Sequence, residues 1–336
     1  MLWTRESEEI AMSYSAHTAE RPCPARVLDV AELIRDKGER RISVVVPALN
    51  ERDTITGVIA SIRDLVGGLV DELVVVDSGS TDDTIARAVA AGADAVYTRE
   101  QALPRVAVRA GKGEVLWRSL AVTIGDIVVF IDSDLHDPDP GFVPALIGPL
   151  LRDPRLHLVK GFYRRPLGDD PHGDSDGGGR VTQLVARPLL TALAPELADL
   201  RQPLGGEYAA TRELLTGIPF APGYGVEIGI LLDAWRRFGR DAIGEADLGV
   251  RHHRNRPTHE LAVMSRQVIA TLLHRLDIPD SGIGLTQFRP EGSGWQRVTH
   301  PVSSADRPPM ATLTTSPATA VTAGRVRARA SARSSR

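Results

Sequence analysis

The chain has almost no cysteine, since Cys23 is the only one among its 336 residues. A fold held by disulfides is therefore excluded. Long apolar runs are also missing, so no stretch of 18 or more apolar residues predicts a membrane span. The first residues, MLWTRESEEIAMSYS, lack the basic and then apolar profile of a signal peptide. These absences predict a cytoplasmic protein that has no membrane partner.

The chain also lacks a strong net charge and is poor in lysine. A net charge of -3 and a pI near 6.3 argue against a general nucleic-acid binder. Of the 40 lysine and arginine residues, only Lys37, Lys112 and Lys160 are lysines. Each of these three therefore merits attention. The hydrophobic content of 42% is enough for a large core in one domain or in two closely packed ones.

The two ends of the chain differ from the middle. Residues 1–40 show weak periodicity, and only VLDVAELIRDKGER predicts an amphipathic helix that packs on the main body. Residues 301–336 are rich in Ser, Thr, Ala, Pro and Arg, a composition that predicts a disordered tail. The ordered protein is thus expected between residues 41 and 300.

The ordered part begins with an alternation of apolar strands and helices. Strands are predicted at 42–46 (which Pro47 should end), 73–76, 93–97 and 127–131, and helices at 55–66, 84–92 and 114–123. Units of this length predict an α/β fold in which helices cover a parallel sheet. Ligands bind such sheets beyond the carboxyl ends of the strands, where polar segments 47–51, 77–81 and 132–134 should meet.

The most informative of these segments follows the strand at 127–131. Asp132 and Asp134 appear where a buried strand ends, and desolvated carboxylates are costly unless a positive group compensates them. A divalent cation that also binds a diphosphate would compensate these carboxylates, because hard cations prefer carboxylate oxygens. A polar turn that closes the strand is the simpler alternative.

Three further segments combine groups that suit anions or metals, although each also has a structural explanation. Lys112 lies between two glycines at a predicted helix start, a setting that suits a phosphate or merely a turn. The segment 177–182, GGGRVT, offers backbone amides, a guanidinium and a hydroxyl for an anion, or is simply a glycine-rich loop. Segment 251–256, RHHRNR, is either a ligand-binding strand or a solvated surface.

The order and spacing of VVVPALNE (44–51), VVVDSGSTDDT (74–84) and VVFIDSD (128–134) resemble the GT-A nucleotide-sugar glycosyltransferases. In these enzymes the first two loops hold the nucleoside, and the third carries the DxD metal motif. RAGKGEVLWRSL (109–120), VKGFYRRP (159–166), GGGRVTQLVARPLL (177–190), QPLGGEY (202–208), PGYGVEIGILLD (222–233), LGVRHHRNRP (248–257) and MSRQVIATLL (264–273) extend the likeness. Together they resemble the actinobacterial glucosyl-3-phosphoglycerate synthases over about residues 41 to 300.

The resemblance implies a role for particular residues. Those implied for the nucleotide sugar are Pro47, Ala48, Leu49, Glu51, Ser78, Lys112, Asp132, Ser133, Tyr224, Glu227 and Arg251. Gly179, Arg180 and Thr182 are implied for the acceptor's phosphate and carboxylate, and Asn255 for the acceptor. Asp134 and His253 are implied as ligands of Mg²⁺ or Mn²⁺, while His252 occupies a variable position.

The implied reaction moves glucose from UDP-glucose to the 2-hydroxyl of D-3-phosphoglycerate with retention of the anomeric configuration. Lys112 would stabilise the leaving diphosphate, and the carbonyl of Leu204 would steady the sugar carbon. We favour same-face attack, with Glu227 as a base or nucleophile as the alternative. The resemblance also implies a homodimer that forms through the helices after Pro257. Within one chain, residues 41–160 would bind the donor and residues 161–300 the acceptor.

Three other functions remain open on the residues alone. A mannosyl-3-phosphoglycerate synthase would share the metal and the acceptor but use GDP-mannose. A nucleotidyltransferase should carry a glycine-rich basic loop after the first strand, where this chain has PALN (47–50). A non-catalytic sensor of nucleotide sugars would bind UDP-glucose without turnover.

Overall fold

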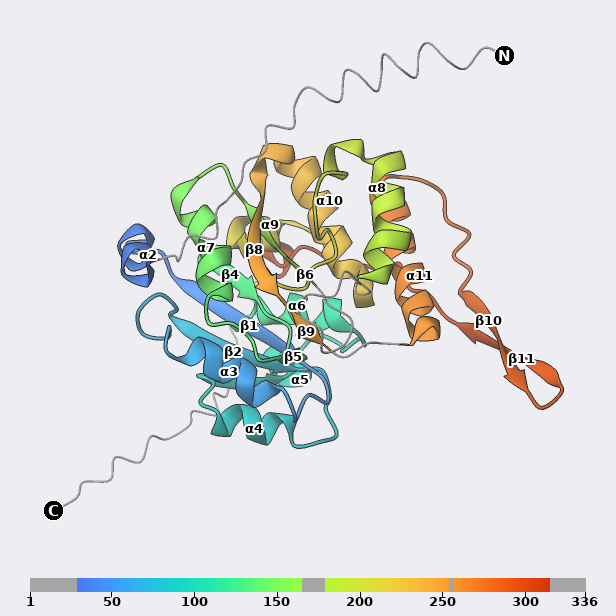
Figure 1. Cartoon of the computed structure of the whole chain (residues 1–336), viewed down its shortest axis with the longest axis horizontal. Coiled ribbons are helices and arrows are strands. Elements are labelled where there is room, and N and C mark those ends of the chain that lie inside the picture. The colour runs from blue at the N-terminus through green and yellow to red at the C-terminus, as the bar shows by residue number, and fades with distance from the viewer. Residues whose placement is uncertain (1–28, 165–178, 254–256, 315–336) are drawn as a thin grey trace, which may run out of the picture.

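A seven-stranded mixed sheet forms the centre of the protein, with helices packed on its two faces (Figure 1). The computed structural model describes residues 29–164, 179–253 and 257–314. In sheet order, the strands are β3 (Ala95–Thr98), β2 (Glu72–Asp77), β1 (Ile42–Ala48), β4 (Ile127–Phe130), β7 (Tyr208–Thr211), β6 (Leu158–Arg164) and β8 (Ile243–Val250). Two small pairs join β5 (Leu135–His136) to β9 (His252–His253) and β10 (Leu285–Glu291) to β11 (Gly294–His300).

Helices precede, separate and follow these strands along the chain. They are α2 (Val30–Lys37), α3 (Ile55–Arg63), α4 (Thr84–Ala90), α5 (Arg99–Ala102), α6 (Lys112–Ser119), α7 (Phe142–Arg152), α8 (Arg187–Leu193), α9 (Arg212–Gly217), α10 (Val226–Phe238), α11 (Thr258–Arg275) and α12 (Ala311–Thr314). The predicted amphipathic helix near the N-terminus is α2, and Arg152 of α7 pairs with its Glu32 and Asp36.

The alternation of side chains along β1 explains the two layers of helices. Val44 and Val46 belong to the apolar cluster that contains α2, α3 and α7. Val45 points to the opposite face and belongs to the cluster built by α6, α9, α10 and α11. Strands β3, β2, β1 and β4 run parallel, whereas β7 pairs antiparallel with β4 and β6. The predicted α/β fold is therefore confirmed, and β7 makes its sheet mixed.

The prediction that Pro47 ends the first strand is wrong, because β1 continues through Pro47 to Ala48. The carbonyl of Val45 accepts a hydrogen bond from Ile131, and that of Ala48 accepts one from Ser78. The backbone polar groups of residues 45 and 47 therefore point toward β4, and those of residue 48 point toward β2. Strand β4 ends at Phe130, opposite Val45. The missing N–H of Pro47 therefore lies beyond the ladder, where it removes no hydrogen bond.

The prediction of a disordered tail over residues 301–336 is wrong for residues 305–310, because they pack on the body of the protein. We name this segment the C-terminal strap. Its Arg307 exchanges two backbone hydrogen bonds with Phe220, and the indole of Trp117 donates to the carbonyl of Pro308. Met310 is 3% exposed. Composition did not reveal these partners, since they lie about 90 to 190 residues away.

Strands β10 and β11 form a hairpin that extends from the body of the molecule beyond α11 (Figure 1). Phe288 and Trp295 of this hairpin are exposed. The sequence analysis did not predict these strands. In the part of the chain that the structure describes, no helix is long and apolar enough to cross a membrane.

Candidate active site

A cavity of about 810 Å³ opens at the carboxyl ends of β1, β2 and β4. It brings together residues that the sequence analysis selected from separate motifs. These are Pro47, Ala48, Leu49, Glu51, Ser78, Lys112, Asp132, Ser133, Asp134, Gly179, Arg180, Thr182, Leu204, Tyr224, Glu227 and Arg251. Asn255 lies outside the described residues, and His253 is described through its backbone alone.

Lys112 joins two of the predicted carboxylates. It is the first residue of α6, as predicted, and Gly111 before it adopts a φ of +105° that favours glycine. The ammonium lies 2.6 Å from Oδ1 of Asp132 and 2.7 Å from Oε1 of Glu227. Burial disfavours the charged form, but these two carboxylates outweigh burial and raise the pKa of Lys112 well above its usual value. Lys112 is therefore a fixed positive charge in the cavity.

Glu227 lies in the first turn of α10, which begins at Val226. Its carboxylate contacts Lys112. Gly225 occupies the N-cap of α10 without a side-chain hydrogen bond. Glycines allow α6 and α10 to approach each other, because a Cβ at Gly113 would collide with the carbonyl of Ala221.

Arg251 is the second fixed cation of the cavity. One guanidinium nitrogen, Nη2, lies 3.1 Å from Asp132, 3.0 Å from Asp134 and 3.0 Å from Glu207. Although burial opposes its charge, Glu207 and the neighbouring acidic groups raise the pKa of Arg251 above its usual value. Glu207 is fully buried. Lys112 and Arg251 thus face four carboxylates, and this excess of negative charge suits a divalent cation.

The backbone brings His253 close to the DxD segment. Strand β9 pairs antiparallel with β5, so that His253 lies opposite Leu135, the residue after Asp134. Among the side chains that the structure describes, no three His, Cys, Asp or Glu residues form a metal-binding group. The side chain of His253 is not among them. The carboxylates of Asp132 and Asp134 and the register of β9 fit a cation that takes hard oxygen ligands and a histidine.

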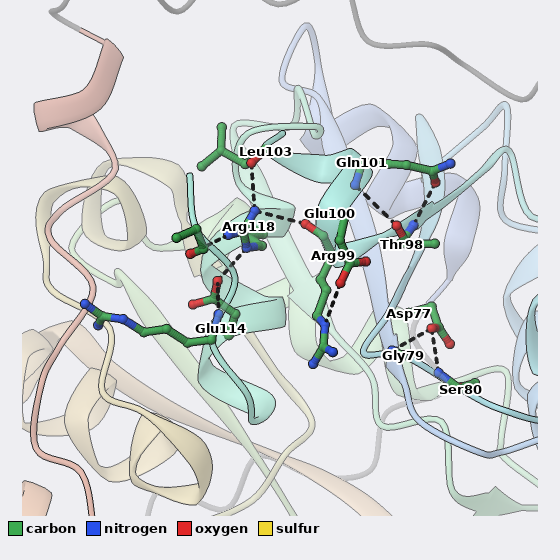
Figure 2. A network of polar contacts seen from close by, with 12 residues as sticks. Asp77, Gly79, Ser80, Thr98, Arg99, Glu100, Gln101, Leu103, Glu114 and Arg118 are labelled. Atoms are coloured by element: carbon green, nitrogen blue, oxygen red, sulfur yellow. Dashed lines mark hydrogen bonds and ion pairs between the residues drawn. The ribbon is translucent and has the colours of Figure 1, made fainter. Parts of the chain in front are cut away.

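The loops after β1 and β2 form one wall of the cavity. The Ser133 hydroxyl donates to the carbonyl of Pro47 at 2.7 Å, which joins the DxD segment to the first loop. The carboxylate of Asp77 accepts hydrogen bonds from Gly79 and Ser80, which turns the chain at the end of β2 (Figure 2). The guanidinium of Arg99 lies beside Gly79, and Arg99 also lines the cavity.

The acceptor candidates Gly179, Arg180 and Thr182 also line the cavity. Gly179 has a φ of +74°, and its carbonyl accepts a hydrogen bond from Gln183. Thr182 is buried and begins a π-helical turn, Thr182–Ala186, that continues into α8. Such turns widen a helix locally and are frequent at functional sites. Residues 177 and 178 of the predicted glycine-rich loop lie outside the described residues.

Several residues near the cavity were not selected from the sequence. Glu207 lies in the motif QPLGGEY but has no local pattern that would predict its partner Arg251. Arg99 could have been found, because it follows the third strand at the same edge of the sheet. Met264 and Val268 of α11, within the motif MSRQVIATLL, also line the cavity.

The fold and the cavity define a GT-A glycosyltransferase. In agreement, the glycosyl transferase family 2 model matches residues 43–196. The chain is 67% identical to the glucosyl-3-phosphoglycerate synthase of Mycolicibacterium paratuberculosis, over 84% of this chain and 87% of that protein. The chain belongs to the family of glucosyl-3-phosphoglycerate synthases.

Solved structures support this assignment. The glucosyl-3-phosphoglycerate synthase from Mycobacterium tuberculosis, in complex with Mn²⁺, UDP-glucose and phosphoglyceric acid, matches with a TM-score of 0.78 and 63% identity. That match covers 85% of this chain and 95% of the crystallised chain. The same enzyme in complex with Mg²⁺ and UDP matches with a TM-score of 0.79 and 64% identity, over 85% and 96% of the two chains.

Proposed function

We propose that the protein transfers glucose from UDP-glucose to the 2-hydroxyl of D-3-phosphoglycerate, with a divalent metal and with retention of configuration. The single observation that carries this proposal is the convergence of Lys112, Asp132, Asp134, Glu227 and Arg251 in one cavity. Such a set suits a sugar bound through a diphosphate, because it offers cations for phosphate oxygens and carboxylates for hydroxyls.

In the proposed complex the donor lies along the wall formed by the first two loops. The nucleoside would contact Pro47, Ala48, Leu49, Glu51 and Ser78, and the rest of the donor Lys112, Asp132, Ser133, Tyr224, Glu227 and Arg251. Residues 41–160 would thus supply most of the donor contacts, while 161–300 would supply the acceptor contacts and would also reach the donor through Tyr224, Glu227 and Arg251. The acceptor would contact Gly179, Arg180, Thr182 and Asn255.

Asp134 and His253 are the proposed ligands of Mg²⁺ or Mn²⁺. When bound, the ion withdraws negative charge from the departing diphosphate as a Lewis acid. Lys112 and Arg251 would stabilise the same charge from fixed positions, since their own contacts already orient them.

The remaining steps concern the sugar. We propose same-face attack, in which the leaving phosphate oxygen accepts the proton of the acceptor hydroxyl. The carbonyl of Leu204, on the cavity wall, would face the sugar carbon as positive charge develops there. Glu227 contacts Lys112, which fixes the position of its carboxylate in the cavity. We propose that this carboxylate binds sugar hydroxyls, with a role as base or nucleophile as the alternative.

A matrix of donors and acceptors tests this function. Purified protein with Mn²⁺ should turn over UDP-glucose with 3-phosphoglycerate at least tenfold faster than GDP-mannose with the same acceptor. Preference for GDP-mannose would indicate a mannosyl-3-phosphoglycerate synthase. Binding of UDP-glucose without any product would instead indicate a sensor.

We further propose a cytoplasmic homodimer. The apolar surface for it was expected on the helices after Pro257, yet Val268 and Leu272 of α11 pack inward. On the hairpin, however, Phe288 and Pro290 lie opposite Arg297 and Trp295 on one exposed face. Light scattering should give about 72 kDa, twice the 36.2 kDa of one chain. A monomer at micromolar concentration would contradict the proposal.

A further inference from the structure

Lys160 is a fully buried lysine next to the cavity but not part of its wall. It lies on β6, is 2% exposed, and pairs in the sheet with Tyr208 of β7. Its ammonium donates a hydrogen bond of 2.5 Å to the carbonyl of Gly205 and lies 4.5 Å from the centre of the Tyr208 ring. Within the described residues, this is the one hydrogen bond that the ammonium makes.

Stability alone does not explain this arrangement. A buried ammonium with one carbonyl acceptor loses much of its hydration, so that an apolar side chain of the same length would pack at lower cost. The chain uses arginine for nearly all of its other cations. A compact ammonium reaches a single carbonyl without the space that a planar guanidinium requires. This position therefore calls for a small positive group.

The carbonyl that Lys160 binds belongs to a tight loop, residues 202–206, between β6 and the DxD segment. The amide of Gly205 closes the loop by donating to the carbonyl of Gln202 at 3.0 Å. A Cβ on Gly206 would collide with the carboxylate of Asp132, and a Cβ on Gly205 would lie 2.9 Å from the carbonyl of Gly161. The loop is thus wedged between the sheet and Asp132.

Leu204 and Gly206 of this loop line the cavity, whereas Gly205 between them points its carbonyl at Lys160. Any rotation of the peptide at Gly205 would move both neighbours. The hydrogen bond from Lys160 opposes that rotation from behind the wall.

We propose that Lys160 is a positioning residue for glucosyl transfer, which holds the 202–206 loop so that Leu204 and Gly206 keep their places against the donor and Asp132. This inference rests on the proposed function. Lys160 would act through the loop and would contact neither substrate.

The charges around Lys160 are consistent with this role. Burial lowers its pKa to about 8, while Glu227, Glu207 and Asp132 favour its charged form and Lys112 disfavours it. The ammonium is therefore charged at neutral pH and neutral in moderately alkaline solution.

The test compares Lys160→Met with Lys37→Met. Lys37 is also buried, but it binds Asp71 and the carbonyl of Gly68, away from the cavity. For Lys160→Met we expect kcat to fall about 10- to 150-fold, the range for losing one hydrogen bond to a charged group. Its melting temperature should be equal to or higher than that of the wild type. Lys37→Met should show the opposite result, a lower melting temperature with kcat within twofold of the wild type.

Hydrogen exchange gives a readout that does not need turnover. In Lys160→Met the amides of residues 202 and 204–208 should exchange at least tenfold faster, while those of β1 and β2 remain unchanged. Unchanged exchange in the loop, or a kcat within twofold of the wild type, would overturn the role of Lys160. Absence of glucosyl transfer by the wild type would instead overturn the proposed function, and the exchange result would still decide whether Lys160 holds the loop.

Discussion

Arg307 and Glu114 form a two-pronged ion pair in the interior of the protein, with Nε 2.6 Å from Oε2 and Nη2 2.7 Å from Oε1. The same carboxylate accepts a hydrogen bond from Arg118, which also binds the carbonyl of Leu103 (Figure 2). Glu114 lies two residues after Lys112 on α6. Arg307 also pairs through its backbone with Phe220, just ahead of α10. The C-terminal strap therefore ties together the two helix starts that carry Lys112 and Glu227.

Removal of the strap should destabilise the protein. Truncation after Ser304 removes Arg307, the ion-pair partner of Glu114. Removing one partner of a buried ion pair costs about 3–5 kcal/mol of unfolding free energy. Arg307→Ala should have a similar effect. Urea unfolding measures the free energy. Truncation after Thr314 is the matched control and should change it by less than about 0.5 kcal/mol. Equal stability of the two truncated proteins would contradict the structural role of the strap.

Loss of Asp134 should nearly abolish transfer. The substitution Asp134→Ala removes an anionic oxygen ligand, and with it the charge and the geometry of the proposed metal site. His253→Ala should raise the metal concentration needed for half-maximal activity. His252→Ala is the control and should behave as the wild type. Assays over a range of Mn²⁺ concentrations measure these effects, and full activity of Asp134→Ala in EDTA would exclude the metal role.

Loss of Arg180 should weaken acceptor binding selectively. A guanidinium can bind one anion of 3-phosphoglycerate through its planar fork, a charge-assisted contact worth roughly 1.5–3 kcal/mol. In Arg180→Ala the KM for 3-phosphoglycerate should rise about 10- to 150-fold, with that for UDP-glucose nearly unchanged. Arg180→Lys should restore part of the loss, because it keeps the charge without the planar fork. An equal loss of donor binding would assign Arg180 to UDP-glucose instead.

The stability of the protein should depend on pH through Lys160. Its pKa is about 8 in the folded protein, against an ordinary value of 10.5. Between these two values the unfolded chain binds more protons, so stability rises with pH. Relative to Lys160→Met, the wild type should gain up to about 3 kcal/mol between pH 7.5 and 10.5. Urea unfolding of both proteins over this range measures the gain, and a constant difference would show that the pKa of Lys160 is not lowered.

The sequence alone predicted the part of the protein that depends on local pattern. Apolar strands β1, β2 and β4 follow from their own residues, and parallel pairing brings the segments after them to one edge. Asp132 and Asp134 were found for that reason. The start of α6 at Lys112 was also predicted, because glycine and a helix N-terminus are visible locally.

What the sequence did not reveal depends on distant partners. The antiparallel insertion of β7 between β4 and β6 has no local signal, although it brings Glu207 to Arg251. The strap was taken for disorder because its composition is polar, yet Arg307 finds a carboxylate 193 residues away. Glu227 was selected from the sequence, but its ion pair with Lys112 depends on the contact between the starts of α6 and α10. No local pattern reveals that contact.

The most direct test of the account is the product itself. Purified protein, Mn²⁺, UDP-glucose and D-3-phosphoglycerate should yield UDP and one new sugar phosphate, which proton NMR can identify. We predict an α-linked glucose on the 2-hydroxyl of 3-phosphoglycerate, formed by the wild type and absent with Asp134→Ala. A β-linked product would contradict retention, and release of UDP with free glucose alone would contradict transfer to 3-phosphoglycerate.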